Sequence, residues 1–178
     1  MKLSIQELNI DRLQDVNRCD SAFTVDSKLV LSAENSVIDY TLVQVITPYQ
    51  KHYPSEELDA AAYIANPDRV IYLAYQEDQI AGQVRLSRYW NRYAYIEDIV
   101  VDPPFRRQGV GRALIEQAIA WAKASGCPGI MLETQNINTA ACRLYARCGL
   151  YLGGFDTCLY RGILPGTDEI ALYWYLIF

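Results

Sequence analysis

Residues 99–114 hold the feature that most constrains the fold, because they join a strand to a helix through a glycine-containing turn. The run Ile99–Val101 is β-rich and ends at two nearby prolines, which predicts the end of a strand. Apolar residues at helical spacing then predict a helix over about Gly109–Lys123. The first turn of a helix leaves about four N–H groups without partners and carries a partial positive charge. Because glycines allow close approach, this turn predicts an anion site suited to a phosphate or diphosphate.

Two better-known glycine motifs fit this turn poorly. A Walker loop requires Gly-Lys-Ser/Thr, whereas Gly111 is followed here by Arg112 and Ala113. A dinucleotide-binding fingerprint requires a third glycine where this chain has Leu114. The alternative is a glycine-containing turn that starts the helix and binds no anion. The arginines of the turn can also face solvent.

Short strands before this turn predict an antiparallel meander. The expected strands cover 70–75, 80–89 and 93–101, with Gly82 as a β-bulge. A strand at 129–134 follows the helix, which implies one parallel crossover. The fold class is therefore α/β, a mixed and mostly antiparallel sheet with helices on both faces. The remaining expected elements are a helix at 138–148 and strands at 151–155, 158–160 and 170–178.

The N-terminal part of the chain is less regular. We expect a first strand at 1–8, a helix capped by Asp11 that continues through Val16, and a helix from Pro54 to Ile64. Residues 37–46 predict a strand, and the rest of 21–46 carries no clear pattern. The length of 178 residues and the lack of a linker predict one domain over 1–178.

Composition narrows the class of function. Sixteen basic against 21 acidic residues give a net charge of −5, which argues against a sequence-independent nucleic-acid binder and is compatible with a cationic substrate. No apolar run is long enough for a membrane span or a signal peptide, so we expect a cytoplasmic protein without a membrane partner. With five cysteines, no C-x-x-C and only His52 as a histidine, we expect no metal site.

Two motifs resemble those of the GNAT superfamily of N-acetyltransferases. They are Arg106-x-x-Gly109-x-Gly111, after Val101-Asp102-Pro103, and Asn138-x-x-Ala141-x-x-Leu144-Tyr145-x-x-x-Gly149-Leu150. The pattern usually has Phe where this chain has Leu150. Further segments resemble the streptothricin acetyltransferases, which acetylate an amine of the β-lysine moiety of a cationic antibiotic. These segments are 90–91, 95–101, 132–138, 148–156 and 173–175.

The resemblance implies acetyl-CoA as co-substrate and a role for each motif residue. The main chain of Ile99 and Val101, splayed at a bulge, would bind the pantetheine and the acetyl carbonyl. Asn138 would contact the pantetheine arm, and Tyr145 would protonate the leaving thiolate. By its helical spacing alone, Tyr145 is instead a core residue. The expected diphosphate-binding residues are Arg106, Arg107, Gln108, Gly109, Val110, Gly111 and Arg112.

The amine needs a partner that accepts its charge, and two carboxylates precede the acetyl-binding strand end. On a regular strand Glu97 and Asp98 point to opposite faces. Glu97 shares the parity of Ile99, so we expect it to act in catalysis by binding the ammonium and passing its proton to water, with Asp98 as a substrate-binding residue. The alternative for these carboxylates is an ion pair with Arg85 or Arg88.

Trp90 and Asp156 are further expected substrate-binding residues. The ring of Trp90 could hold a cation, and Asp156 follows a glycine pair near the expected cleft. Their alternatives are a packed aromatic side chain and a turn residue.

These observations predict an acetyl-CoA-dependent N-acetyltransferase that acts by direct transfer in a ternary complex. Its expected substrate is a cationic, amine-bearing small molecule, and streptothricin is the favoured one. Another amine (a polyamine, an aminoglycoside or a protein lysine) is one alternative. A non-catalytic acyl-CoA-binding module is another, and a homodimer is left open.

Overall fold

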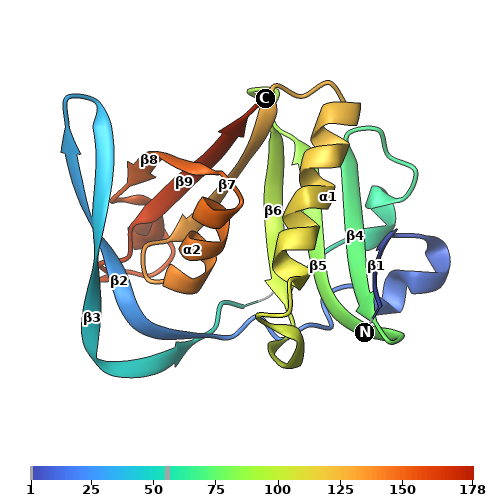
Figure 1. Cartoon of the computed structure of the whole chain (residues 1–178), viewed down its shortest axis with the longest axis horizontal. Coiled ribbons are helices and arrows are strands. Elements are labelled where there is room, and N and C mark those ends of the chain that lie inside the picture. The colour runs from blue at the N-terminus through green and yellow to red at the C-terminus, as the bar shows by residue number, and fades with distance from the viewer. Residues whose placement is uncertain (1, 55–56) are drawn as a thin grey trace. The chain divides into compact units, whose positions relative to one another are not determined.

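The computed structural model describes residues 2–54 and 57–178. The chain divides into two compact units (Figure 1). The first unit contains residues 1–21, 53–131 and 177–178, and the second contains residues 22–52 and 132–176.

The first unit is built on an antiparallel sheet. Its strands lie in the order β1 (Leu3–Glu7), β4 (Arg69–Gln76), β5 (Gln79–Arg88) and β6 (Ala94–Val101). The predicted meander is confirmed, because β4, β5 and β6 pair in sequence order. β7 (Gly129–Gln135) begins in this unit, next to β6 in the strand order, so that β6, α1 (Val110–Ala124) and β7 form the expected crossover.

Helix α1 lies against β5 and β6 (Figure 1). Its buried side chains Leu114, Ile115 and Ala118 recur at helical spacing, which is why this segment forms a helix that packs on a sheet. A Cβ at Gly82 would lie 2.7 Å from Val100 O and 3.1 Å from Leu114 Cδ1, so only glycine allows this close approach.

The bulge expected at Gly82 lies one residue earlier. Gly82 pairs regularly with Ala74, and the register then shifts so that Tyr75 faces Ile80 and Ala81 is the extra residue. The glycine is therefore required by packing, and the bulge is centred on its neighbour.

Short 3-10 helices replace two predicted helices on the other side of the sheet. η1 (Ile10–Asp15) is capped by Asn9, whose side chain accepts from the Asp11 N–H at 3.0 Å, so the prediction of Asp11 as the cap is wrong. An extended Val16 and a positive φ at Asn17 end the helix there. Residues 55–56 of the helix predicted at Pro54–Ile64 lie outside the described residues, and the described part of this segment contains only η2 (Ala60–Tyr63).

The second unit contains a long hairpin. β2 (Phe23–Glu34) pairs with β3 (Val37–Lys51), and the two residues between them, Asn35 and Ser36, both have positive φ. Such a two-residue turn matches the twist of a hairpin. The predicted strand at 37–46 is confirmed and extended, and its partner was not predicted.

The rest of the second unit packs around Trp174. The end of β7, β9 (Ala171–Ile177) and β8 (Tyr151–Asp156) lie in that order, together with α2 (Thr139–Arg147). Trp174 is 1% exposed and faces Tyr145 and Tyr40, with ring centroids 6.1 and 6.2 Å apart. The strand predicted at 158–160 is wrong, since η4 (Leu159–Gly162) occupies these residues.

Candidate active site

The turn between β6 and α1 has the geometry of an anion cradle. After η3 (Pro103–Phe105), Arg107 and Gly109 have φ of 61° and 90°, which turn the chain into the helix. The first main-chain bond of α1 runs from the Ala113 N–H to Gly109 O at 3.0 Å, so the N–H groups of Val110 and Gly111 are not used by the helix. A Cβ at Gly109 would meet nothing within 4 Å, so glycine is required there by its conformation. The helix dipole adds positive potential at the same place.

Most side chains of this turn bind the protein itself. Arg106 Nε donates to Val101 O at 2.8 Å, and its Nη2 donates to Asp20 O at 2.9 Å. Gln108 Nε2 donates to Pro104 O at 2.8 Å. The expected anion-binding role of this turn is therefore a matter of main-chain N–H groups more than of these side chains.

The two other arginines of the turn are exposed. Arg112 Nε lies 2.8 Å from Glu116 Oε1, one turn along the helix, and Arg107 lies at the surface. Their guanidinium groups can add charge near the cradle.

A β-bulge in β6 brings the two predicted carboxylates to one face. Arg85 pairs with Asp98, but the next residue of β5, Leu86, pairs with Ile96, so that Glu97 is the extra residue. Glu97 lies against Arg85 and Asp98 against Gln83, two residues of β5 that share a face. The expectation of opposite faces is wrong, because the bulge interrupts the alternation.

Glu97 is held through one of its oxygens. Tyr63 OH donates to Glu97 Oε2 at 2.6 Å, and Arg85 Nε lies 3.0 Å from the same oxygen. The ion pair with Arg85, weighed above as the alternative, is therefore present. Burial, and then the hydrogen bond to Glu97, raise the pKa of Tyr63 to about 12.

Asp98 is oriented by a buried amide. Gln83 Nε2 donates at 2.7 Å to Asp98 Oδ2 and also at 2.7 Å to Asn17 Oδ1, while Gln83 Oε1 accepts from the Asn17 N–H at 2.8 Å. Tyr63, Gln83 and Asn17 were missed by the sequence analysis. A glutamine between the apolar residues Ala81 and Val84 of a predicted strand was the available signal for Gln83, since a buried amide requires partners.

The main chain of Ile99 and Val101 faces away from β5. The Asp102 N–H donates to Ala81 O of β5 at 3.0 Å, and hydrogen-bonding direction alternates along an antiparallel strand. Val101 O, which accepts from Arg106, fits this alternation. The orientation is compatible with the ligand-binding role expected for these two residues.

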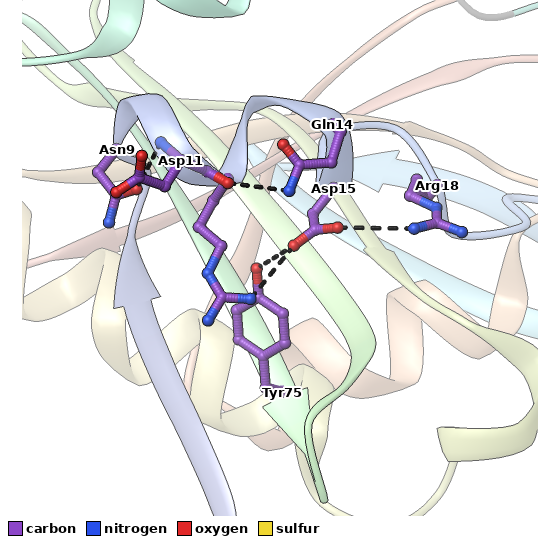
Figure 2. A network of polar contacts seen from close by, with 7 residues as sticks. Asn9, Asp11, Gln14, Asp15, Arg18 and Tyr75 are labelled. Carbon is purple, nitrogen blue, oxygen red and sulfur yellow. Dashed lines mark hydrogen bonds and ion pairs between the residues drawn. The ribbon is translucent and has the colours of Figure 1, made fainter.

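A cavity of about 480 Å³ lies beside the same turn in the first unit. Asp15, one of its lining residues, is central to a polar network (Figure 2). Its carboxylate accepts from Tyr75 OH at 2.7 Å and lies 3.7 and 3.6 Å from Arg12 Nη1 and Arg18 Nη1. The hydrogen bond from Tyr75 fixes η1 against β4. The lining of the cavity also includes Asp102, Pro104 and Phe105.

Two predicted site residues lie on α2 in the second unit. Asn138 caps the helix, with its Oδ1 accepting from the Ala141 N–H at 3.3 Å. Tyr145 is buried against Trp174, as the spacing alternative expected.

The two further substrate-binding candidates differ in surroundings. Asp156 Oδ1 accepts from the N–H groups of Cys158 and Leu159 at 2.6 and 3.0 Å, which is the turn role weighed as its alternative. In the first unit, Trp90 is 84% exposed beside Tyr89.

The sequence analysis did not predict Glu133, a carboxylate whose pKa is raised. In the second unit, Tyr160 OH donates to Glu133 Oε1, and burial raises the pKa of Glu133. Its position within the segment 132–138, one of those that carry the family resemblance, was the signal available in the sequence.

Residues 2–54 and 57–178 hold no group of three His, Cys, Asp or Glu side chains placed to bind a metal ion. Within the same ranges, no helix is long and apolar enough to cross a membrane.

Comparisons with known proteins identify the family of this chain. The model of the acetyltransferase (GNAT) family matches residues 39–150. Streptothricin acetyltransferase A of Bacillus subtilis is 38% identical over 93% of this chain and 95% of its own length.

Two solved structures resemble the chain over nearly its full length. A candidate streptothricin acetyltransferase from Bacillus anthracis, solved in complex with acetyl coenzyme A, has a TM-score of 0.91 and 45% identity, covering 100% of this chain and 98% of its own. A nourseothricin acetyltransferase has a TM-score of 0.83 and 31% identity, covering 99% of each chain.

Proposed function

Because this chain belongs to the acetyltransferase (GNAT) family, we propose that it transfers the acetyl group of acetyl-CoA to an amine of the β-lysine moiety of streptothricin. It is an acetyl-CoA-dependent N-acetyltransferase, which excludes the non-catalytic module considered above. The observation that carries the choice of substrate is the match over 93% of the chain to a protein named streptothricin acetyltransferase A.

The cradle before α1 binds the diphosphate of acetyl-CoA. The N–H groups of Val110 and Gly111 are not used by the helix, and Gly109 leaves open space beside them. Acetyl-CoA supplies an activated acetyl group on sulfur. The main chain of Ile99 and Val101 holds the pantetheine and polarises the acetyl carbonyl, and the side-chain amide of Asn138 contacts the pantetheine arm.

The acceptor amine is bound by the carboxylates on β6. A lysine-like ammonium with a pKa near 10.4 costs roughly 4–5 kcal/mol to deprotonate at pH 7. Glu97 and Asp98 lie on one face and each is held through one oxygen, so the other oxygens can accept from the ammonium. The carboxylate of Glu97 orients the amine while its proton passes to water. The ring of Trp90 and the carboxylate of Asp156 bind other cationic parts of the substrate.

Tyr145 protonates the leaving thiolate. A phenol with a pKa near 10 can donate to a thiolate whose acid has a pKa near 8.5 when the two are in contact, because the difference in pKa is modest. Most of the rate enhancement then comes from positioning the amine and the thioester in line.

Transfer is direct, without an acetylated enzyme. Burial raises the pKa of Cys19 to about 11 and of Cys142 to about 12, so these thiols stay protonated and are weak nucleophiles. Intersecting initial-rate patterns are expected when both substrates are varied. An acetyl-cysteine adduct on protein treated with acetyl-CoA alone would argue against direct transfer.

The experiment that tests the substrate is a comparison of acceptors at equal concentration. Streptothricin, a polyamine, an aminoglycoside and peptides that present a lysine or a free N-terminus are each incubated with acetyl-CoA and analysed by mass spectrometry. We expect streptothricin to show the highest kcat/KM, with the acetyl group on its β-lysine moiety. A higher kcat/KM for any other acceptor would contradict the proposed substrate.

A further inference from the structure

Both main-chain polar groups of Asp20 form hydrogen bonds with residues of the turn between β6 and α1. Its main-chain N–H donates to Asp102 Oδ1 at 2.8 Å, and its carbonyl accepts from Arg106 Nη2 at 2.9 Å. Arg106 Nε also donates to Val101 O at 2.8 Å. One guanidinium thus connects the end of β6 to a segment far away in sequence.

Asp102 directly precedes the η3 turn, and Arg106 directly follows it. The Phe105 N–H donates to Asp102 O at 2.9 Å and the Arg106 N–H to Pro103 O at 3.3 Å, so Asp102 and Arg106 are joined through the turn as well. Their common attachment to Asp20 fixes where the turn ends and where the glycine-containing segment begins.

Asp20 is itself held in place. The reciprocal hydrogen bonds between Asn17 and Gln83 attach the same segment to β5. The hydrogen bond from Tyr75 to Asp15 attaches η1, directly before it, to β4 (Figure 2). A segment anchored in this way can act as a fixed support for the turn.

We propose that Asp102 and Arg106, closed on the main chain of Asp20, hold the cradle in its diphosphate-binding form. This inference rests on the proposed function. In this proposal Arg106 acts as a positioning residue, in place of the direct contact with the diphosphate expected from the sequence. The rigid planar fork of a guanidinium suits a donor to two separate carbonyls, and a lysine ammonium lacks this fixed geometry. Amide cradles bind anions well only when they are preorganised, so a loosened turn loses affinity without losing a direct contact.

The test measures acetyl-CoA affinity by calorimetry for the wild type, Arg106→Gln, Asp102→Ala and the double variant. Loss of a charge-assisted hydrogen bond is expected to weaken binding by about tenfold in each single variant. Asp102 and Arg106, hydrogen-bonded to the main chain of Asp20, are called the clamp. The double variant should bind about as weakly as the weaker single variant, because both changes break the same clamp. Asp102→Asn should recover most of the affinity, since its amide oxygen can still accept from the Asp20 N–H. Arg147→Gln, an exposed arginine on α2, is the charge-matched control.

A second measurement separates positioning from direct binding. Without acetyl-CoA, the main-chain N–H groups at positions 105 and 106, which are hydrogen-bonded within the η3 turn, should exchange faster in Arg106→Gln and in Asp102→Ala than in the wild type and in Arg147→Gln. Unchanged exchange together with additive losses of affinity would overturn the clamp and would make Arg106 a direct ligand. A wild type that does not bind acetyl-CoA would overturn the proposed function instead, and the exchange rates would still decide the clamp.

Discussion

Each of the two carboxylates at the β6 bulge, Glu97 and Asp98, is held through one of its oxygens. Glu97 Oε2 accepts a hydrogen bond from Tyr63 OH and forms an ion pair with Arg85. Asp98 Oδ2 accepts a hydrogen bond from Gln83 Nε2. Among residues 2–54 and 57–178, no partner contacts Glu97 Oε1 or Asp98 Oδ1. A carboxylate held in this way is oriented before a cation arrives, which lowers the entropy cost of binding.

Glu97→Gln is expected to lower kcat/KM for the amine by about 10–100-fold and to leave the KM for acetyl-CoA unchanged, because a neutral amide attracts an ammonium weakly. Steady-state kinetics with each substrate varied will measure both effects. Glu34→Gln, at an exposed position in the hairpin, is the control. Equal kcat/KM for Glu97→Gln and the wild type would remove Glu97 from substrate binding.

Two buried tyrosines predict a loss of stability at alkaline pH. Burial, followed by the hydrogen bonds to Glu97 and Asp15, raises the pKa of Tyr63 and of Tyr75 to about 12. A raised folded-state pKa contributes stability that is complete below the unfolded pKa near 10 and is lost as pH rises towards 12. The free energy of unfolding, measured in urea between about pH 8 and 11, should therefore fall less steeply in Tyr63→Phe than in the wild type. A parallel pH dependence would contradict this; exposed Tyr151→Phe is the control.

At the scale of elements, local signals were sufficient where each segment had its own periodicity. The meander and both long helices followed from alternation, helical spacing and glycine positions. The ion pair of Glu97 with Arg85 was considered from sequence as an alternative, but its hydrogen bond from Tyr63 was not. The side of β6 on which Glu97 lies depends on a bulge in the pairing of β5 with β6, which local patterns do not reveal. β2 was missed although its polar residues alternate with small or apolar ones, because Asp26 and Lys28 belong to residue types that are rare in strands.

Gly82→Ala tests the close approach between β5, β6 and α1. The new Cβ would lie 2.7 Å from Val100 O, so the variant should lose about 1–3 kcal/mol of unfolding free energy in urea denaturation. Gly162→Ala, where a Cβ meets nothing within 4 Å, should stay close to the wild type. Equal stability of the two variants would show that the strands can separate at no cost.

At the scale of the whole molecule, charge matters for substrate encounter. The chain carries a net charge of −5, and the proposed acceptor is a cation. The kcat/KM for streptothricin should therefore fall several-fold as ionic strength rises from about 10 mM to 0.3 M. An uncharged amine acceptor is the control and should show a flat profile. A salt-independent kcat/KM for streptothricin would mean that long-range attraction contributes nothing.

The proposed site residues are distributed over both units of the chain. The anion cradle and the β6 carboxylates belong to the first unit, while Asn138 and Tyr145 belong to the second. The sequence motifs predicted both sets because each motif is local. One domain over 1–178, like the assignment of each site residue to its ligand, stays a prediction.

Amide hydrogen exchange of the wild type with and without acetyl-CoA tests the central claim most directly. If the cradle binds the diphosphate, the N–H groups of Gly109, Val110 and Gly111 will exchange more slowly when acetyl-CoA is bound. Unchanged exchange at these three positions, with acetyl-CoA bound as judged by calorimetry, would contradict the account.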